Sequence, residues 1–431
     1  MELYDKIADL ALLWRRTAEI FPRFEEVKCD WDQAFYDFLP RLAGTDDVQT
    51  HLLFAEFMNL LGDGHTDYQF PRAFLKEMGS LPFSLRYCGN AYFVDGTLPG
   101  QEDRLGAVVE KIDGRPFSDI LDEAAKYGYR VGKFMPEFRL NGLLPLLLSG
   151  KAHTMETSNG SFSFRLLPEK PELHSVGNGR KFEMRRLENN ILYGNLPDFI
   201  HGDSAAKVRA ALEEERMPSG LILDIRENIG GMTLLGARVA ELLIPGEFSG
   251  CRKRTRIGRG VDLASASQII LESPEERARE IAAGFYTQED VENSRRQMAG
   301  TYTESYQDRF GREGQQALFT GPCVVLTSRR TVSAAEDFLA MLRSNRRATV
   351  IGTPTCGTTG TSMLLRLRCG GGARICSVGY RLLDGTEFLG CGIRPDIPME
   401  PTPEDLLAGR DPVLEKAIAL LSQASQPNFC S

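Results

Sequence analysis

The stretch "GLILDIRENIGGMTLLGARVAELLI" at residues 220–244 decides the fold class. Its first six residues are almost entirely apolar, and a charged turn with a glycine pair leads from them into apolar residues at helical spacing. A strand that is apolar at every position needs cover on both faces, as strands between two layers of helices have. The stretch therefore predicts one strand–turn–helix unit of a parallel α/β sheet.

The same unit recurs further along the chain. "CVVLTSRRTVSAAEDFLAML" at 323–342 again joins an apolar run to a helical pattern, and "ATVIG" at 348–352 supplies another strand. Upstream, the helical segment 205–216 follows the strand-like run "NNILYGNLP" at 189–197. Alternating strands and helices from about residue 181 onward predict one α/β core.

The pattern of apolar and polar residues differs on either side of these units. A chain of 431 residues is also long enough for two or three domains. We expect a multi-domain α+β chain with the following divisions: an N-terminal helical region at 1–75, a small β-rich module at 76–130, a connecting helix and a hairpin around Asn159–Gly160 at 131–180, and the core at 181–431 with a polar insertion at 250–318.

Composition excludes several classes of protein. The hydrophobic fraction of 42% and charged fraction of 26% are those of a folded water-soluble chain. A net charge of −8 argues against nucleic acid as a partner. No apolar run approaches the roughly eighteen residues that span a bilayer, so no membrane span is expected. The N-terminus lacks the features of a secretory leader, which makes a cytoplasmic location the expectation.

The cysteines and histidines predict neither a disulfide framework nor a metal site. Nine cysteines are scattered over the whole chain, an odd number without C-x-x-C spacing. The five histidines never form an H-E-x-x-H motif. We therefore expect reduced thiols, no metal and no organic cofactor.

Ser333 stands where the strand at 323–327 turns into its helix. Ligands of open α/β sheets bind beyond the carboxyl ends of the strands, and the first turn of a helix offers unpaired N–H groups to an oxyanion. The local alternative is that Ser333 only caps the helix, with Glu336 three residues later completing a capping box. Taken alone, the local sequence favours the cap.

Two further stretches bear on this choice. The pair Gly230-Gly231 allows a backbone to approach a substrate closely, although a tight turn explains an isolated glycine pair as well. His65 in "LLGDGHTDYQF" at 60–70 lies in a glycine-flanked turn, where a histidine can serve as a base or merely bond to backbone.

These stretches, in this order and followed by "GCGIRPDIP" at 390–398, resemble the C-terminal-processing, or tail-specific, serine peptidase family. That family includes the tricorn core protease and the interphotoreceptor retinoid-binding repeats. The resemblance covers most of the chain and implies a crotonase/ClpP-like core of spiralling βαβ units. It also implies a PDZ-like character for the β-rich module, where "LGAVVEKIDGRPFSDIL" at 105–121 contains the usual I-D-G turn.

The resemblance also implies roles for individual residues. Ser333 is then the nucleophile. The Ser/Lys type of the family places a lysine where this chain has Thr358, and no lysine occurs between Lys253 and Lys416, so a Ser/Lys dyad through this loop is excluded. The tricorn type uses a histidine from the N-terminal part, and His65 matches it.

The remaining site residues follow from the same resemblance. The N–H groups of Ala334 and of Gly230 or Gly231 are the implied oxyanion donors. For the group that orients His65 the candidates are Glu387 and Asp63, because Gly64 stands where the tricorn type has a serine.

The sequence thus predicts a serine-type peptidase that hydrolyses unstructured peptides or C-terminal tails. The alternative is a non-catalytic protein that binds a peptide or an apolar ligand on the same fold, and a crotonase-type acyl-CoA enzyme is a weaker third option. A short distance between Ser333 and His65 would favour catalysis. The sequence leaves the oligomeric state open, a homo-oligomer included.

Overall fold

The computed structural model describes residues 1–148, 152–175, 181–200, 202–214, 216–255, 260–298 and 309–424. At its centre is a six-stranded sheet with the strand order β18-β14-β13-β11-β10-β9. Its strands are β9 (Glu183–Arg186), β10 (Ile191–Asn195), β11 (Gly220–Asp224), β13 (Cys323–Thr327), β14 (Thr349–Gly352) and β18 (Ile397–Pro398). All neighbours pair in parallel except β9, which runs antiparallel to β10. The predicted parallel α/β core is confirmed.

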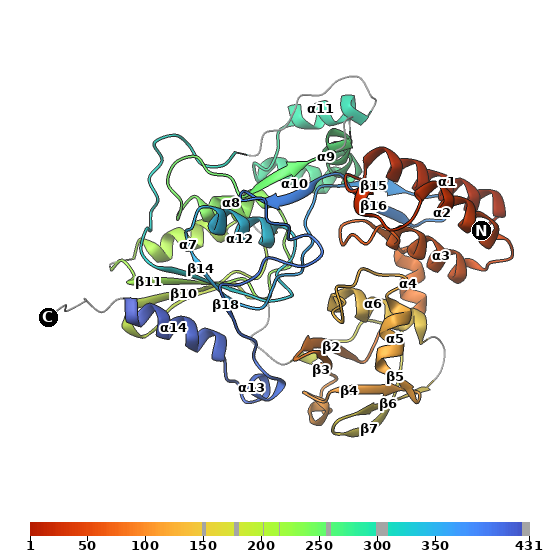
Figure 1. Ribbon diagram of the computed structural model, residues 1–431, viewed down its shortest axis with the longest axis horizontal. Coiled ribbons are helices and arrows are strands. Elements are labelled where there is room, and N and C mark those ends of the chain that lie inside the picture. The colour runs from red at the N-terminus through yellow and green to blue at the C-terminus, as the bar shows by residue number, and fades with distance from the viewer. Residues whose placement is uncertain are drawn as a thin grey trace.

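Helices cover both faces of this sheet. Leu221 and Leu223 of β11 point into a core shared with α7 (Ser204–Leu212), α8 (Thr233–Ala240) and α12 (Ala334–Ser344). Ile222, between them, points into the opposite core, which α14 (Pro412–Ala424) completes. Figure 1 shows α14 on the side of the sheet opposite α7, α8 and α12. The strand is apolar at successive positions because each of its faces is buried.

The N-terminal helices do not form a core of their own. They are α1 (Leu3–Ile20), α2 (Trp31–Phe38) and α3 (Asp47–Asn59), with 3₁₀ turns at Phe24–Glu26 and Leu39–Leu42. Their apolar faces share one cluster with the small sheet formed by β1 (Asp67–Gln69), β15 (Ser362–Arg366) and β16 (Gly372–Cys376). β1 pairs with β16 across some 300 residues of chain, so the N-terminal region is fastened to the C-terminal half.

The β-rich module is larger than predicted. It contains α4 (Arg72–Met78), β2 (Phe83–Cys88), β3 (Ala91–Thr97), β4 (Val109–Ile112), β5 (Arg115–Pro116), α5 (Phe117–Ala124), α6 (Glu137–Leu147), β6 (Ala152–Thr157), β7 (Gly160–Arg165) and β8 (His174–Ser175), with a 3₁₀ turn at Glu102–Arg104. The hairpin around Asn159–Gly160 is present as β6–β7. However, β6 pairs with β4, so the predicted boundary at residue 130 would cut through one sheet and its single core.

The predicted insertion at 250–318 contains β12 (Cys251–Arg254), α9 (Gly260–Leu271), α10 (Pro274–Ala282) and α11 (Gln288–Met298); its residues 256–259 and 299–308 lie outside the described part of the chain. β12 pairs with β17 (Gly379–Leu382), and α9 packs on β15. The segment is thus tied to the sheet that holds the N-terminal helices. A 3₁₀ turn at Glu188–Asn190 and α13 (Pro403–Leu407) complete the described elements.

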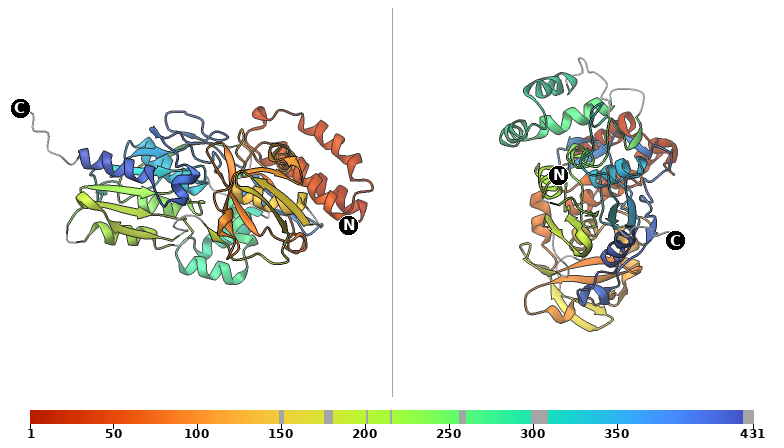
Figure 2. Two further views of the ribbon diagram at one scale, coloured as in Figure 1. Left: turned by 90° about the horizontal axis from the view of Figure 1, so that it is seen from below. Right: turned by 90° about the vertical axis from the view of Figure 1, so that its left-hand side faces the viewer.

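Figure 1 and the left view of Figure 2 place the N-terminal helices (red) at one end of the long axis and the core sheet with α14 (blue) at the other. In the described residues, no helix is both long and apolar enough to cross a bilayer. The crotonase-like description of the core and the PDZ-like description of the module remain predictions from the resemblance.

Candidate active site

Two turns meet at the carboxyl ends of β11 and β13. These strands are parallel neighbours, so the turns that follow them leave the same edge of the sheet. Side chains and backbone of one turn bond directly to the other: the Thr331 hydroxyl donates to the carbonyl of Ile225 (2.8 Å) and the Val332 N–H to that of Asn228 (2.9 Å). The turn that carries Gly230 and Gly231 is therefore fixed against the turn that carries Ser333.

Ser333 has an unusual backbone conformation for a residue with a side chain. Its φ of +60° and ψ of −124° lie in a region that costs a non-glycine residue about 1–3 kcal/mol. Its N–H donates to the carbonyl of Thr358 (3.0 Å) and to the carboxylate of Glu336 (3.3 Å). The capping-box pair of Ser333 and Glu336 is thus present at the start of α12, and it holds the serine in this strained conformation.

The structure brings His65 to Ser333 across 268 residues of sequence. The Nε2 atom of His65 lies 3.0 Å from the Ser333 Oγ, and its Nδ1 lies 2.6 Å from the Thr358 Oγ1. The backbone of His65 is fixed as well, because its N–H donates to Asp63 (2.8 Å) and its carbonyl accepts from the Ser362 hydroxyl (2.9 Å). Such a distance is that of a nucleophile and a general base in hydrogen-bond reach.

Burial sets the protonation state of His65. The side chain is 9% exposed, and this desolvation, assisted by the positive charge of Arg374 and Arg139, lowers its pKa to about 4. The negative charges of Asp63 and Asp67 oppose the shift. The imidazole is therefore neutral at pH 7 and able to accept a proton from the serine.

Two backbone N–H groups beside Ser333 are available to an oxyanion. Ala334 opens α12, and Gly231 is exposed; among the described residues neither N–H has a hydrogen-bond acceptor. The Gly230 N–H, by contrast, is buried and donates to the Asn228 side chain (2.9 Å). Of the two glycines that the sequence left open, the geometry favours Gly231, together with Ala334.

Gly230 and Gly231 still need to be glycines, for steric reasons. Their φ angles are +90° and +133°. A Cβ on Gly230 would lie 2.6 Å from the Ser333 Cβ, and a Cβ on Gly231 would lie 2.3 Å from the carbonyl oxygen of Phe199. The Phe199 backbone runs beside this turn, donating to Gly230 and accepting from Met232. A glycine pair allows this close approach of three chain segments.

The structure contradicts the prediction that Glu387 orients His65. Glu387 is 49% exposed. The turn after β17 folds back and pairs the backbone of Glu387 with that of Arg381, and the two side chains form an ion pair. Asp63, the other candidate, binds the backbone of His65 rather than its ring, and its second oxygen accepts from Arg23 (2.7 Å). Neither carboxylate reaches the His65 Nδ1.

The sequence did not reveal the role of Thr358, nor that Glu336, predicted as the capping-box partner of Ser333, also binds the loop at 355–358. The Glu336 carboxylate is fully buried and accepts from the Thr355 hydroxyl and from the N–H groups of Gly357 (2.8 Å), Thr358 (2.8 Å) and Ser333. Burial raises its pKa to about 8, against these hydrogen bonds, which lower it. Glu336 thus ties the loop at 355–358 to the helix that begins at Ser333. The signal in the sequence was the alignment of Thr358 with a catalytic lysine position, which placed it near the nucleophile.

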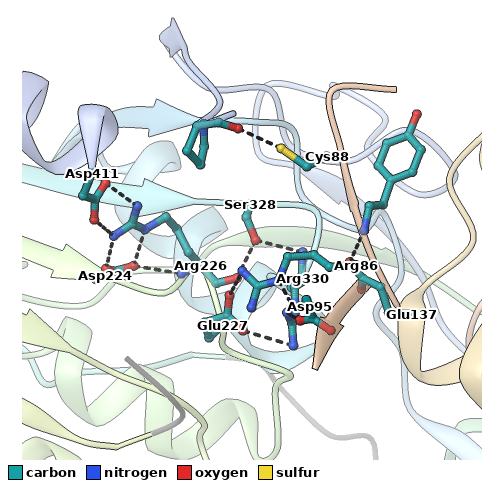
Figure 3. Close-up of polar contacts among 12 residues, drawn as sticks. Arg86, Cys88, Asp95, Glu137, Asp224, Arg226, Glu227, Ser328, Arg330 and Asp411 are labelled. Carbon is teal, nitrogen blue, oxygen red and sulfur yellow. Dashed lines mark hydrogen bonds and ion pairs between the residues drawn. The ribbon is translucent and has the colours of Figure 1, made fainter. Parts of the chain in front are cut away.

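An ion-pair ring joins the β-rich module to both turns of the site (Figure 3). Arg86 and Asp95 come from β2 and β3, Glu227 from the turn after β11, and Arg330 from the turn after β13. The four N–O distances are Arg86–Asp95 3.0 Å, Arg86–Glu227 3.3 Å, Arg330–Glu227 3.1 Å and Arg330–Asp95 3.9 Å. All four side chains are at most a quarter exposed. The module is therefore in direct ionic contact with the segments that position Gly231 and Ser333.

Comparison with known proteins identifies the domain that holds this geometry. Residues 190–399 match the profile of peptidase family S41. The chain contains a peptidase family S41 domain. Ser333, Glu336, Thr358 and the glycine pair lie inside this domain, whereas His65 reaches it from the N-terminal region.

Curated relatives of the S41 domain match over parts of their length. A carboxy-terminal-processing protease of Bartonella bacilliformis is 37% identical over 84 residues, which are 19% of this chain and 19% of that protein. A chloroplastic C-terminal processing peptidase of Tetradesmus obliquus is 25% identical over 217 residues, 50% of this chain and 36% of that protein. The matched segments thus cover well under two thirds of these relatives.

Solved structures match over nearly the whole chain. Mature CPAF superposes with a TM-score of 0.70 at 15% identity and covers 99% of both chains. The photosystem II D1 C-terminal processing protease gives a TM-score of 0.52 at 17% identity, over 98% of both chains. At such identities these structures establish a shared fold, with the N-terminal helices and the β-rich module included in it.

Proposed function

We propose that this chain is a serine-type peptidase that hydrolyses peptide bonds in unstructured peptides or C-terminal tails, with Ser333 as nucleophile and His65 as general base. The observation that carries the proposal is the 3.0 Å contact between the Ser333 Oγ and the His65 Nε2, beside the N–H groups of Gly231 and Ala334, for which the described residues supply no acceptor. The peptidase family S41 domain supports it.

Acylation follows from this arrangement. The His65 Nε2 takes the hydroxyl proton of Ser333, and the oxygen forms a bond to the carbonyl carbon of the scissile peptide. The carbonyl oxygen becomes an oxyanion, which we expect the Gly231 and Ala334 N–H groups to bind. Removal of one such donor typically costs about 3–4 kcal/mol of transition-state stabilisation. Imidazolium then gives its proton to the leaving amine as the C–N bond breaks.

Deacylation repeats the same steps with water. His65 takes a proton from a water molecule, the hydroxide attacks the ester of Ser333, and the proton returns to the serine oxygen as the new carboxylic acid leaves and ionises in water. One water molecule is consumed for each peptide bond, and the protein ends unchanged. The proposed steps use Ser333, His65 and the N–H groups of Gly231 and Ala334.

An extended substrate chain is the expected form. Ser333 is partly buried between the turn at 228–232 and the loop at 355–358, so a peptide bond within a folded element would not reach it. The names of the curated relatives point to C-terminal processing of their own substrates. We extend this substrate class to the present chain as part of the proposal.

The alternative, a binding protein without catalysis, is less well supported. A binding site does not need a strained serine within hydrogen-bond distance of a neutral, buried histidine.

The test is acylation of the protein by a fluorophosphonate probe, combined with digestion of an unstructured protein and mass spectrometry of the cut sites. We expect labelling and cleavage by the wild type and neither by Ser333→Ala. Ser265→Ala is a matched control, because Ser265 is exposed on α9 in the similar sequence "LASAS" and should leave both activities unchanged. Equal labelling of wild type and Ser333→Ala would exclude Ser333 as the nucleophile.

A further inference from the structure

The group that faces the second nitrogen of His65 is a hydroxyl rather than a carboxylate. The Thr358 Oγ1 lies 2.6 Å from the Nδ1, and Thr358 is 4% exposed. The two oxygens of Asp63 are engaged by the His65 N–H and by Arg23, and Asp67 forms ion pairs with Arg139 and Arg374. Among the described residues, Thr358 is the hydrogen-bond partner of this nitrogen.

We propose that Thr358 is the positioning residue of His65, and that its hydroxyl oxygen accepts a hydrogen bond from the Nδ1–H of the neutral ring and of the imidazolium. This inference rests on the proposed peptidase function. During acylation His65 gains a proton on Nε2 and keeps the proton on Nδ1, so both ring nitrogens become donors. The Thr358 Oγ1 is the acceptor within reach of the second one. No proton leaves Nδ1 in this step.

The backbone of Thr358 is fixed relative to the nucleophile itself. Its carbonyl accepts from the Ser333 N–H (3.0 Å), and its own N–H donates to the Glu336 carboxylate (2.8 Å). The adjacent Gly357 is held by Glu336 and by the Tyr129 hydroxyl. Thr358 therefore binds the nucleophile through its backbone and the base through its side chain, which fixes the distance between the two.

Gly64 supplies the space that the Thr358 side chain needs. A Cβ on residue 64 would lie 2.3 Å from the Thr358 Oγ1 and 2.7 Å from its Cβ. Any side chain at position 64 would therefore displace the threonine hydroxyl from His65. The glycine before the histidine and the threonine opposite it form a steric pair that leaves this place to the hydroxyl.

The experiment compares three substitutions in this loop by the rate constant of acylation with the fluorophosphonate probe, and by kcat and KM on an unstructured peptide. Thr358→Val keeps the shape and removes the hydroxyl, Thr358→Ser keeps the hydroxyl, and Thr359→Val removes the hydroxyl of the next residue. Thr359 is equally buried, but its hydroxyl donates to the Asp337 carboxylate (2.8 Å) and not to His65. It is therefore the matched control.

We expect Thr358→Val to lower the acylation rate constant and kcat about 100-fold with little change in KM, in the range by which general-base catalysis accelerates reactions. Thr358→Ser should stay within about fivefold of the wild type, and Thr359→Val should keep the wild-type rate. A Thr358→Val protein that acylates as fast as the wild type, or a Thr358→Ser protein as slow as Thr358→Val, would overturn the inference. Absence of acylation in the wild type would refute the proposed function instead.

A spectroscopic measurement covers the case in which Thr358→Val does not fold. In the phosphonylated wild type at acid pH, a ¹⁵N-histidine spectrum should show an exchange-protected Nδ1 proton of His65, assigned by its loss in His65→Gln. Its chemical shift should move in Thr358→Ser and stay in Thr359→Val. An identical shift in all three proteins would contradict the contact with Thr358.

Discussion

Gly230 lies so close to Ser333 that a Cβ on the glycine would be 2.6 Å from the serine Cβ and 2.6 Å from the Val332 carbonyl oxygen. We therefore expect Gly230→Ala to lower acylation by at least about 100-fold and to destabilise the fold by about 1–3 kcal/mol. The acylation rate and the denaturant midpoint measure the two effects.

Gly385→Ala separates these effects. Gly385 has nearly the same φ, +92°, but nothing lies within 4 Å of its added Cβ. This control should show the backbone cost without the loss of activity. A Gly230→Ala protein that acylates like Gly385→Ala would mean that the turn tolerates a larger separation from Ser333.

The pH dependence of acylation should reflect the buried histidine. Because the pKa of His65 is lowered to about 4, the base remains neutral well below pH 6.5, and the acylation rate should fall to half only near pH 4. The rate constant measured from pH 3.5 to 8 tests this, with circular dichroism to confirm that the protein is folded at each pH. Half-maximal acylation near pH 6.5 would contradict it.

The same shift affects stability with a defined sign. Below pH 6.5 the histidine of the unfolded chain gains a proton, whereas His65 in the folded chain stays neutral until about pH 4. The unfolded state is thereby favoured as the pH falls through this window. His65→Gln should reduce the dependence of the free energy of unfolding on pH between 6.5 and 4, as measured by urea denaturation.

Glu336→Gln should disrupt the loop at 355–358. Each oxygen of Glu336 accepts from two donors, so at pH 9, above its pKa of about 8, a carboxylate satisfies all four, whereas the NH₂ group of glutamine would face two donors whichever way the amide is turned. We expect a loss of about 1–3 kcal/mol in stability and a parallel loss of acylation. Gln49→Glu makes the reverse exchange, an amide for a carboxyl group, in the exposed capping box of α3. No buried network depends on this side chain, so the stability should stay near that of the wild type. A stable, fully active Glu336→Gln protein would show that the loop does not depend on this carboxylate.

The ion-pair ring of Arg86, Asp95, Glu227 and Arg330 should couple the β-rich module to the site. Glu227→Gln removes a charge that faces two arginines, so we expect a loss of about 1–3 kcal/mol in stability. Because Glu227 lies three residues before Gly230 in the same turn, acylation should also become slower. A double-mutant cycle with Arg86→Leu measures the coupling across the module boundary.

Glu123→Gln provides the control for this charge. Glu123 pairs with Arg115 within the module, and both side chains are exposed to solvent by a third or more, so the change should cost less than about 1 kcal/mol and leave acylation unchanged. Additive effects of Glu227→Gln and Arg86→Leu would show that the module and the site are energetically independent.

The sequence was informative where a structural requirement is local. Apolar runs such as residues 220–225 identify strands covered on both faces, because each position in them is buried. Several motifs in register also linked Ser333 to His65, although either residue alone has an ordinary local explanation.

Two predictions were wrong because pairing between distant segments decides them. The position of Glu387 is decided by a turn that bridges it to Arg381, and the extent of the β-rich module by the pairing of β4 with β6 across α5 and α6. Periodicity shows that one face of α1 or α3 is covered, but it does not show that β15 and β16, some 300 residues away, cover it. The sequence at Thr358 indicates only that a lysine is absent, since a hydroxyl in a threonine-rich loop has no distinguishing pattern.

The attachment of the N-terminal helices to the β15–β16 sheet has a consequence for the biosynthesis of the protein. His65 leaves the ribosome 268 residues before Ser333, and β16, which pairs with the strand just after His65, follows later still. A nascent or truncated chain that ends before the nucleophile turn thus contains the base without the nucleophile. By this order of synthesis, the proposed hydrolysis of peptide bonds cannot begin before the nucleophile turn and β16 have been made.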